Sequence, residues 1–174
     1  MNRLWKFLIL VSVALYANSN QAKAWRGIEP LHSTRADVQR VLGSKVVRCG
    51  GSACVYELDE ETILVLYATD SSCKNDDALS AWKVPVGTVV EISVRFKEEK
   101  QLSELHFDLS KFERAEDEHL PGWIYYTNLD EGVRVEGGLQ TVSSVRYFQS
   151  AKDNYLRCPA ANKAKVKRST FESR

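Results

Sequence analysis

Histidine side chains are the candidates in this sequence for acid–base chemistry or metal binding. His106 lies two residues before Asp108, and His119 directly follows an acidic run at 116–118. Imidazoles beside carboxylates can hold a metal ion or move protons, so this pair would suit a small secreted hydrolase or a metal-dependent enzyme. Neither histidine belongs to a zinc, phosphate-binding or nucleophile motif. We therefore predict no catalytic residue, no metal site and no cofactor, and keep the enzyme as the alternative function.

Four cysteines form the second candidate set: Cys49, Cys54, Cys73 and Cys158. Their intervals lack the two short cysteine pairs of a zinc ribbon, whereas an even number of cysteines in an exported chain is typical of disulfides. Three pairings are open to four cysteines. Cys49 and Cys54 flank a glycine-containing turn between two strand-like segments, and such residues lie at about the separation that a disulfide needs. This geometry favours Cys49 with Cys54, which leaves Cys73 with Cys158.

Large aromatic side chains form the third set of candidates, and they would serve in binding a partner. Trp82, Trp123 and Tyr126 combine a large apolar ring with a polar group, a type of side chain enriched at protein interfaces. Tyr125 and Tyr126 are adjacent in a strand-like segment, so they point to opposite faces of a sheet. We predict Trp82, Trp123 and Tyr126 as partner-binding residues; the alternative is that these rings pack in the core.

The N-terminal segment predicts export. A basic opening is followed by an apolar run from 7 to 17 and by an Ala-Lys-Ala triplet at 22–24, which are the three parts of a cleavable signal peptide. The apolar run is shorter than the roughly 20 residues of a membrane span. We therefore expect residues 1–24 to be removed and the mature protein to reach the periplasm or the extracellular space, with no transmembrane segment.

Beyond the signal peptide, the chain has the length of one domain, predicted over 25–160, followed by a basic, disordered tail at 161–174. Residues 25–162 carry 16 basic and 22 acidic side chains, a net charge of −6. Nucleic-acid-binding domains usually present a basic face, so we expect no nucleic-acid partner. The expected partner is a protein of the cell envelope, and the sequence does not fix the oligomeric state.

The elements that must position these residues follow from local patterns. Ser33 or Thr34 can cap a helix over 34–42 whose apolar residues share one face, and Gly43 can end it. Strands are predicted at 46–49, 54–58, 62–67, 89–96, 123–127, 132–136 and 142–148, and 108–120 could hold a second short helix. The outline of 55–96 recurs over 124–148, which suggests an internal duplication. The predicted fold is α+β: a twisted antiparallel sheet of five to seven strands with one packed helix and two disulfides.

The predicted helix carries a sequence pattern that also occurs in known protein families. Thr34, Arg35, Val38, Leu42 and Gly43 form a Thr-Arg-x-x-Val … Leu-Gly series before the hairpin. Over residues 32–56 this resembles two families, the SmpA/OmlA-type outer-membrane assembly lipoproteins and the secreted β-lactamase-inhibitor proteins. The chain departs from the first because no acylated cysteine would begin the mature protein. It departs from the second because no other Thr-Arg helix follows in the C-terminal half.

Segments 25–35, 82–85 and 151–159 also resemble a set of exported bacterial proteins that have no assigned function. This broader resemblance implies one folded unit and supplies no activity. The two nearer families imply binding or scaffolding in the envelope. The function predicted from the sequence is therefore that of an exported, non-enzymatic binding or envelope-interaction domain.

Overall fold

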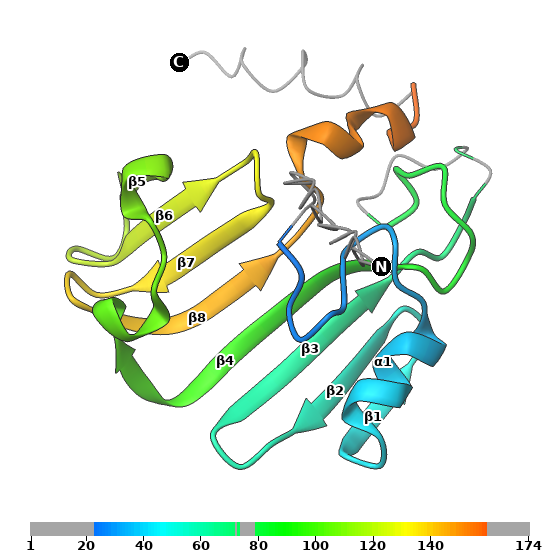
Figure 1. Cartoon of the computed structure of the whole chain (residues 1–174), viewed down its shortest axis with the longest axis horizontal. Helices are drawn as coiled ribbons and strands as arrows, with labels where there is room; N and C mark the ends of the chain where they lie inside the picture. Colours follow the sequence, from blue (N-terminus) through cyan, green and yellow to red (C-terminus); the bar gives the residue numbers. More distant parts are fainter. Residues whose placement is uncertain (1–22, 72, 74–78, 160–174) are drawn as a thin grey trace, which may run out of the picture.

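Eight β-strands pair side by side in one antiparallel sheet, in the order β1-β2-β3-β4-β8-β7-β6-β5 (Figure 1). This computed structural model describes residues 23–71, 73 and 79–159. The strands are β1 (Val46–Gly50), β2 (Ala53–Glu57), β3 (Glu61–Tyr67), β4 (Val89–Gln101), β5 (Glu113–Glu116), β6 (Ile124–Asn128), β7 (Val133–Gly137) and β8 (Thr141–Tyr147).

The sheet consists of two meanders of four consecutive strands each. Strands β1 to β4 form one meander and β5 to β8 form the other, and the two are joined where β4 pairs with β8. The last strand of each meander therefore lies at the centre of the sheet, and the first strand of each lies at an edge. This arrangement repeats the outline that the sequence shows over 55–96 and 124–148.

The predicted α+β class is wrong, because strands account for most of the regular structure. The described residues contain a single α-helix, α1 (Arg35–Leu42), which has eight residues. The second helix expected within 108–120 is instead the 3₁₀ turn η2 (Leu109–Lys111) followed by the edge strand β5. All four side chains of β5 are exposed, so no apolar alternation marks it as a strand, and the predicted number of strands was too low.

Helix α1 begins and ends at the residues that the sequence indicated. Thr34 is the N-cap, and the carboxylate of Asp37 accepts a hydrogen bond from the Thr34 backbone N–H at 2.8 Å, which closes a capping box. Gly43 ends the helix with a φ of 57°, a conformation that favours glycine. Two further 3₁₀ segments, η1 (Leu102–Leu105) and η3 (Ala151–Leu156), follow β4 and β8.

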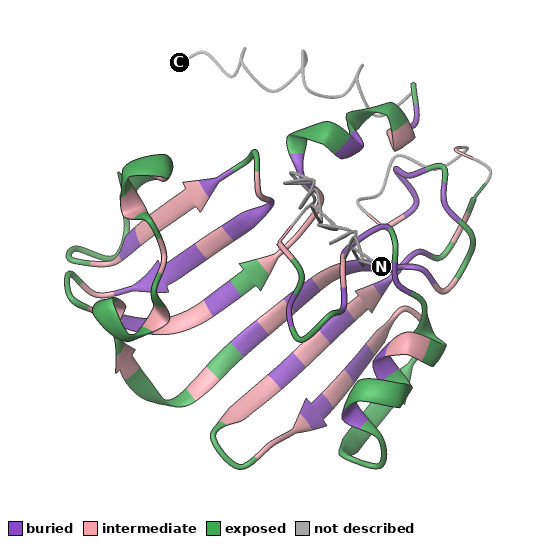
Figure 2. Cartoon of the chain, viewed as in Figure 1, coloured by how far each residue is buried: buried purple, intermediate pink, exposed green. Residues whose placement is uncertain are grey.

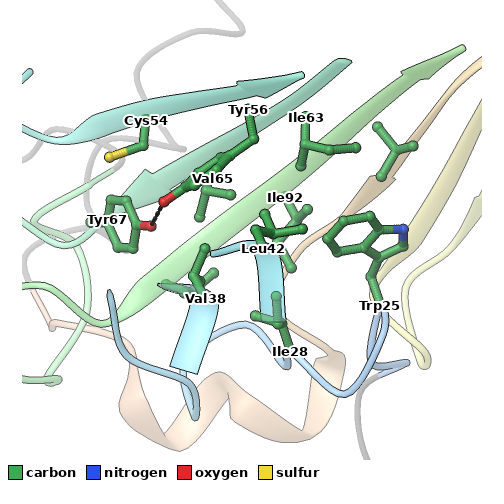
Figure 3. Close-up of a cluster of buried hydrophobic side chains, with 12 residues drawn as sticks. Trp25, Ile28, Val38, Leu42, Cys54, Tyr56, Ile63, Val65, Tyr67 and Ile92 are labelled. Carbon is green, nitrogen blue, oxygen red and sulfur yellow. Dashed lines mark hydrogen bonds between the residues drawn. The ribbon is translucent and has the colours of Figure 1, made fainter. Parts of the chain in front are cut away.

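The main core lies between one face of the sheet and the segment 25–42. Val38 and Leu42 of α1 and Trp25 and Ile28 of the N-terminal segment pack on buried side chains of β2, β3 and β4 (Figure 3). Arg35 lies over the ring of Tyr67 at 4.0 Å and donates a hydrogen bond to the carbonyl of Gly51. The arginine of the Thr-Arg pair thus ties α1 to the β1–β2 hairpin.

The other half of the same sheet face is covered by residues 102–112. Buried valines of β7 and β8 pack there against Leu102, Leu105, Phe107 and Phe112. The burial colours alternate along β3 and β4 (Figure 2), as expected of strands with one face in a core. We call this side of the sheet the covered face and the opposite side the open face.

Two disulfides join the pairs that hairpin geometry favoured. Cys49 bonds to Cys54 across the β1–β2 turn, and Cys73 bonds to Cys158 over 85 residues of sequence. The first disulfide joins the two strands of one hairpin. The second fixes the segment after β3 to the segment that follows η3, so the two bonds constrain very different lengths of chain.

The predicted signal peptide and basic tail fall almost entirely on residues 1–22 and 160–174, outside the described residues, and both remain predictions. Trp25, the expected first residue of the mature protein, is buried, and its backbone exchanges hydrogen bonds with Ile28. Among the described residues, no helix is long and apolar enough to cross a membrane.

Candidate functional site: the open face of the sheet

The three aromatic residues predicted to bind a partner do not lie together on one exposed surface. Trp82 is only 3% exposed and packs in a core cluster with Leu31, Val84 and Val90. Tyr126 is half-buried and packs on the valines of the covered face. Trp123, just before β6, is also half-buried. Trp82 and Tyr126 pack within the fold, and the binding role predicted for the three rings stays a prediction.

The two histidines of the alternative enzyme are exposed and lie on separate loops. His106 follows η1 with a φ of 52°, and the backbone N–H of His119 donates a hydrogen bond to Asp117. Asp117 also accepts a hydrogen bond of 2.6 Å from the Tyr125 hydroxyl, which lowers the pKa of the carboxyl and raises the pKa of the phenol. Within the described ranges, no three His, Cys, Asp or Glu side chains gather as a metal site.

The open face is defined by residues that lie directly opposite one another from strand to strand. Opposed residues of antiparallel strands point to the same face. One such row has a residue from each of the eight strands: Arg48, Val55, Leu64, Ser93, Arg146, Arg134, Thr127 and Glu113. The parallel row beside it carries Thr62, Arg95, Ser144, Glu136 and Tyr125.

Within the described chain, segments outside the sheet border the open face near Trp82, after β8 and at Asp117, which accepts a hydrogen bond from Tyr125. The first two of these segments help to line a hollow. On the open face, Val55 of β2 and Leu64 and Leu66 of β3 are half-buried. A hollow of about 430 Å³ lies over this part of the sheet, between Arg48 on β1 and Glu136 on β7. The surface therefore alternates apolar and charged side chains across a concavity.

A second hollow, of about 380 Å³, adjoins the first and shares Glu91 and Arg146 with it. It lies where β4, β8 and β7 meet the loop carrying Trp82 and the residues that follow β8. Arg134, Arg146 and Arg157 line it together with apolar side chains. Among the residues that the structure describes, three guanidinium groups and one carboxylate, that of Glu91, thus border this concavity.

An ion pair between a buried carboxylate and a half-exposed arginine lies beside both hollows, since Arg146 lines the two of them. The Glu136 side chain is 7% exposed and lies 2.9 Å from Nε of Arg146, and it also accepts a hydrogen bond of 3.0 Å from the Ser144 hydroxyl. Nη2 of Arg146 donates a long hydrogen bond of 3.4 Å to Oε2 of Glu136, whereas the approach of Nε to Oε1 lacks hydrogen-bond geometry. One hydrogen bond and the attraction between opposite charges thus hold this contact. A buried carboxylate without such a partner would be strongly disfavoured.

Comparisons with protein-family models, with curated proteins and with solved structures found no match to this chain. Sequence reasoning identified only part of the open face: the outward residues Glu91, Ser93 and Arg95 of the strand at 89–96. The arginines of β7 and β8 join them only through the β4–β8 pairing, which has no local signal in the sequence.

Proposed function

We propose that the protein is an exported, non-enzymatic binding domain that engages a protein partner of the cell envelope through the open face of its sheet. The observation that carries the proposal is the continuous row of side chains across all eight strands, on the face opposite to the one covered by α1 and residues 102–112. A sheet whose other face is packed in the core offers a large, rigid platform for a partner.

The composition of the open face supports binding. Val55, Leu64 and Leu66 provide half-buried apolar surface at one side, and the arginines and glutamates around them provide directional polar contacts. Protein interfaces combine an apolar centre with a polar rim, and arginine is enriched in them. The flanking hollows give the surface a shape that a complementary partner could fill.

Export is the second part of the proposal. It is supported by the signal-peptide pattern of residues 1–24 and by the two disulfides, which persist in oxidising compartments. N-terminal sequencing of the protein from its natural cell checks this part. We expect the mature chain to begin at or next to Trp25; an intact Met1 would contradict export by cleavage.

Site-specific photo-crosslinking of the full chain in its natural cell tests the surface. A benzophenone amino acid is placed at Leu64 or Ser93 on the open face, and at Ala36 on the exposed side of α1 as the matched control. We expect one protein to be captured from positions 64 and 93 and not from 36. Equal capture from all three positions, or none from the open face, would overturn the proposal.

A further inference from the structure

The arginine-lined hollow beside Trp82 has more positive charge than its own fold neutralises. Arg134 and Arg146 lie directly opposite each other on β7 and β8, which is an unfavourable arrangement for like charges. Glu136 pairs with Arg146 alone. In the part of the chain that the structure describes, Arg134 has no carboxylate within ion-pair distance, and its Nε donates to the Thr127 hydroxyl at 3.1 Å.

Arg157 adds a third guanidinium, and it has an unsatisfied donor. Its Nε is buried and makes no hydrogen bond among the described residues. The guanidinium lies over the indole of Trp82 at 5.5 Å, and the isolated bridge between the two backbones keeps both residues in place. A buried donor without a partner is costly, and an acceptor entering the hollow would supply that partner.

The remaining wall of the hollow is apolar. Leu66, Leu79 and Phe148 line it beside the indole of Trp82. Guanidinium groups bind carboxylate, phosphate and sulfonate oxygens well, often through two hydrogen bonds. Apolar side chains next to them favour a ligand whose anionic group is attached to an apolar body.

We infer that this hollow is a binding site for an anionic oxygen group carried on an apolar body, with Arg134 and Arg157 as its ligands. The inference rests on the proposed function, because the group would come from the protein partner, as an acidic side chain or C-terminal carboxylate next to apolar residues. A free amphiphilic anion has the same chemistry. Of the carboxylates in the described ranges, Glu91 alone lines the hollow, and its negative charge repels the anion.

The test uses the mature disulfide-bonded protein and two dyes that differ in charge. Anilinonaphthalene sulfonate carries a sulfonate on an apolar body, and N-phenylnaphthylamine is its neutral counterpart. We expect Arg134→Gln and Arg157→Gln each to weaken sulfonate binding roughly tenfold, the effect of losing a charge-assisted hydrogen bond. Binding of the neutral dye should stay within about twofold.

Two further variants make the test specific to charge in this hollow. Arg95→Gln removes an exposed arginine of the same face that does not line the hollow, so sulfonate binding should be unchanged. Glu91→Gln removes the opposing carboxylate, so sulfonate binding should tighten several-fold. Near-ultraviolet circular dichroism excludes dye binding to a loosened variant.

The crosslinking experiment distinguishes an anionic group of the partner from a free anion. Loss of partner capture from position 64 in Arg134→Gln, together with loss of sulfonate binding, assigns the anion to the partner. If Arg134→Gln loses sulfonate binding but still captures the partner, the hollow is still an anion site, and its ligand is a free anion. Equal sulfonate affinity in Arg134→Gln, Arg157→Gln and Arg95→Gln would overturn the inference, and it would leave the proposed use of the open face untouched.

Discussion

Arg134 and Arg146 lie directly opposite each other on the neighbouring strands β7 and β8 of the open face. Glu136 is only two residues from Arg134 along β7, yet it forms its ion pair with Arg146 on β8. The carboxylate thus offsets a repulsion between two guanidinium groups that the strand register forces together. The arginine proposed to bind an anion, Arg134, thus lies directly opposite an ion pair that contributes to stability.

The first prediction concerns this coupling. Glu136→Gln should lower the free energy of unfolding by about 1–2 kcal/mol, because Arg146 loses its counter-charge while still facing Arg134; half-exposed Arg146 keeps the loss below that of a fully buried pair. In an Arg134→Gln background the same change should cost at least roughly 0.5 kcal/mol less. Urea unfolding of the four proteins measures the double-mutant cycle. Strict additivity would show that Glu136 and Arg134 are not coupled, so that the carboxylate offsets only the charge of Arg146.

The second prediction concerns Trp82, whose ring packs in the core. Trp82→Ala should lower the free energy of unfolding by about 3–5 kcal/mol, the usual loss for a buried tryptophan. Trp123→Ala, at a half-buried position, should cost clearly less. Thermal and urea melts of the two variants compare them directly. A larger loss at Trp123 would mean that the core is centred on β6 and not on the loop beside β4.

The features that the sequence predicted correctly are those encoded within a few residues. Thr34 and Gly43 mark the ends of α1 because capping depends on local backbone groups, and the glycine-containing turn brings Cys49 and Cys54 together. The alternation at 89–96 also identified the outward side of β4 correctly. Local patterns thus predicted one helix, one hairpin disulfide, and which side chains of one central strand point away from the core.

The fold class and the candidate site required information that lies far apart in the sequence. Strand β5 has four exposed side chains and exists because its backbone pairs with β6. The open face depends on the pairing of β4 with β8, which sets Ser93 against Arg146. The burial of Trp82 likewise depends on packing against Leu31 and Leu156 from both ends of the domain. No periodicity in a single segment reports such contacts.

The third prediction ranks the two disulfides. In the chain-entropy description, a bond that closes 85 residues stabilises the fold by about 4–5 kcal/mol, against about 2 kcal/mol for a bond that closes five. Replacing Cys73 and Cys158 by serine should therefore lower the melting temperature more than replacing Cys49 and Cys54. Thermal melts of the two double variants under oxidising conditions decide it. Equal losses would mean that the hairpin bond stabilises contacts well beyond its own turn.

The last prediction concerns Asp153, which joins the two ends of the domain. Its side chain is 6% exposed and lies 3.0 Å from Nε2 of His32, and it accepts hydrogen bonds from the backbone N–H and the hydroxyl of Ser150 at 2.9 and 2.7 Å. Burial alone would raise the pKa of this carboxyl. The hydrogen bonds from His32 and Ser150 outweigh burial and lower the pKa below its ordinary value.

A carboxyl whose pKa is lower in the folded than in the unfolded protein contributes stability above its unfolded pKa, near 3.9, and this contribution is lost as the pH falls through the folded pKa. Asp153→Asn should therefore lower the free energy of unfolding by roughly 2 kcal/mol at neutral pH, the scale of hydrogen bonds to a charged group. The difference from the wild type should shrink steadily below about pH 4. His32→Gln keeps a neutral hydrogen-bond donor next to Asp153, so it should lower the free energy of unfolding less than Asp153→Asn does. Urea unfolding between pH 2 and pH 7 supplies both curves. A constant gap between them would mean that Asp153 is already protonated in the folded protein, and that its contacts with His32 and Ser150 hold a neutral carboxyl group.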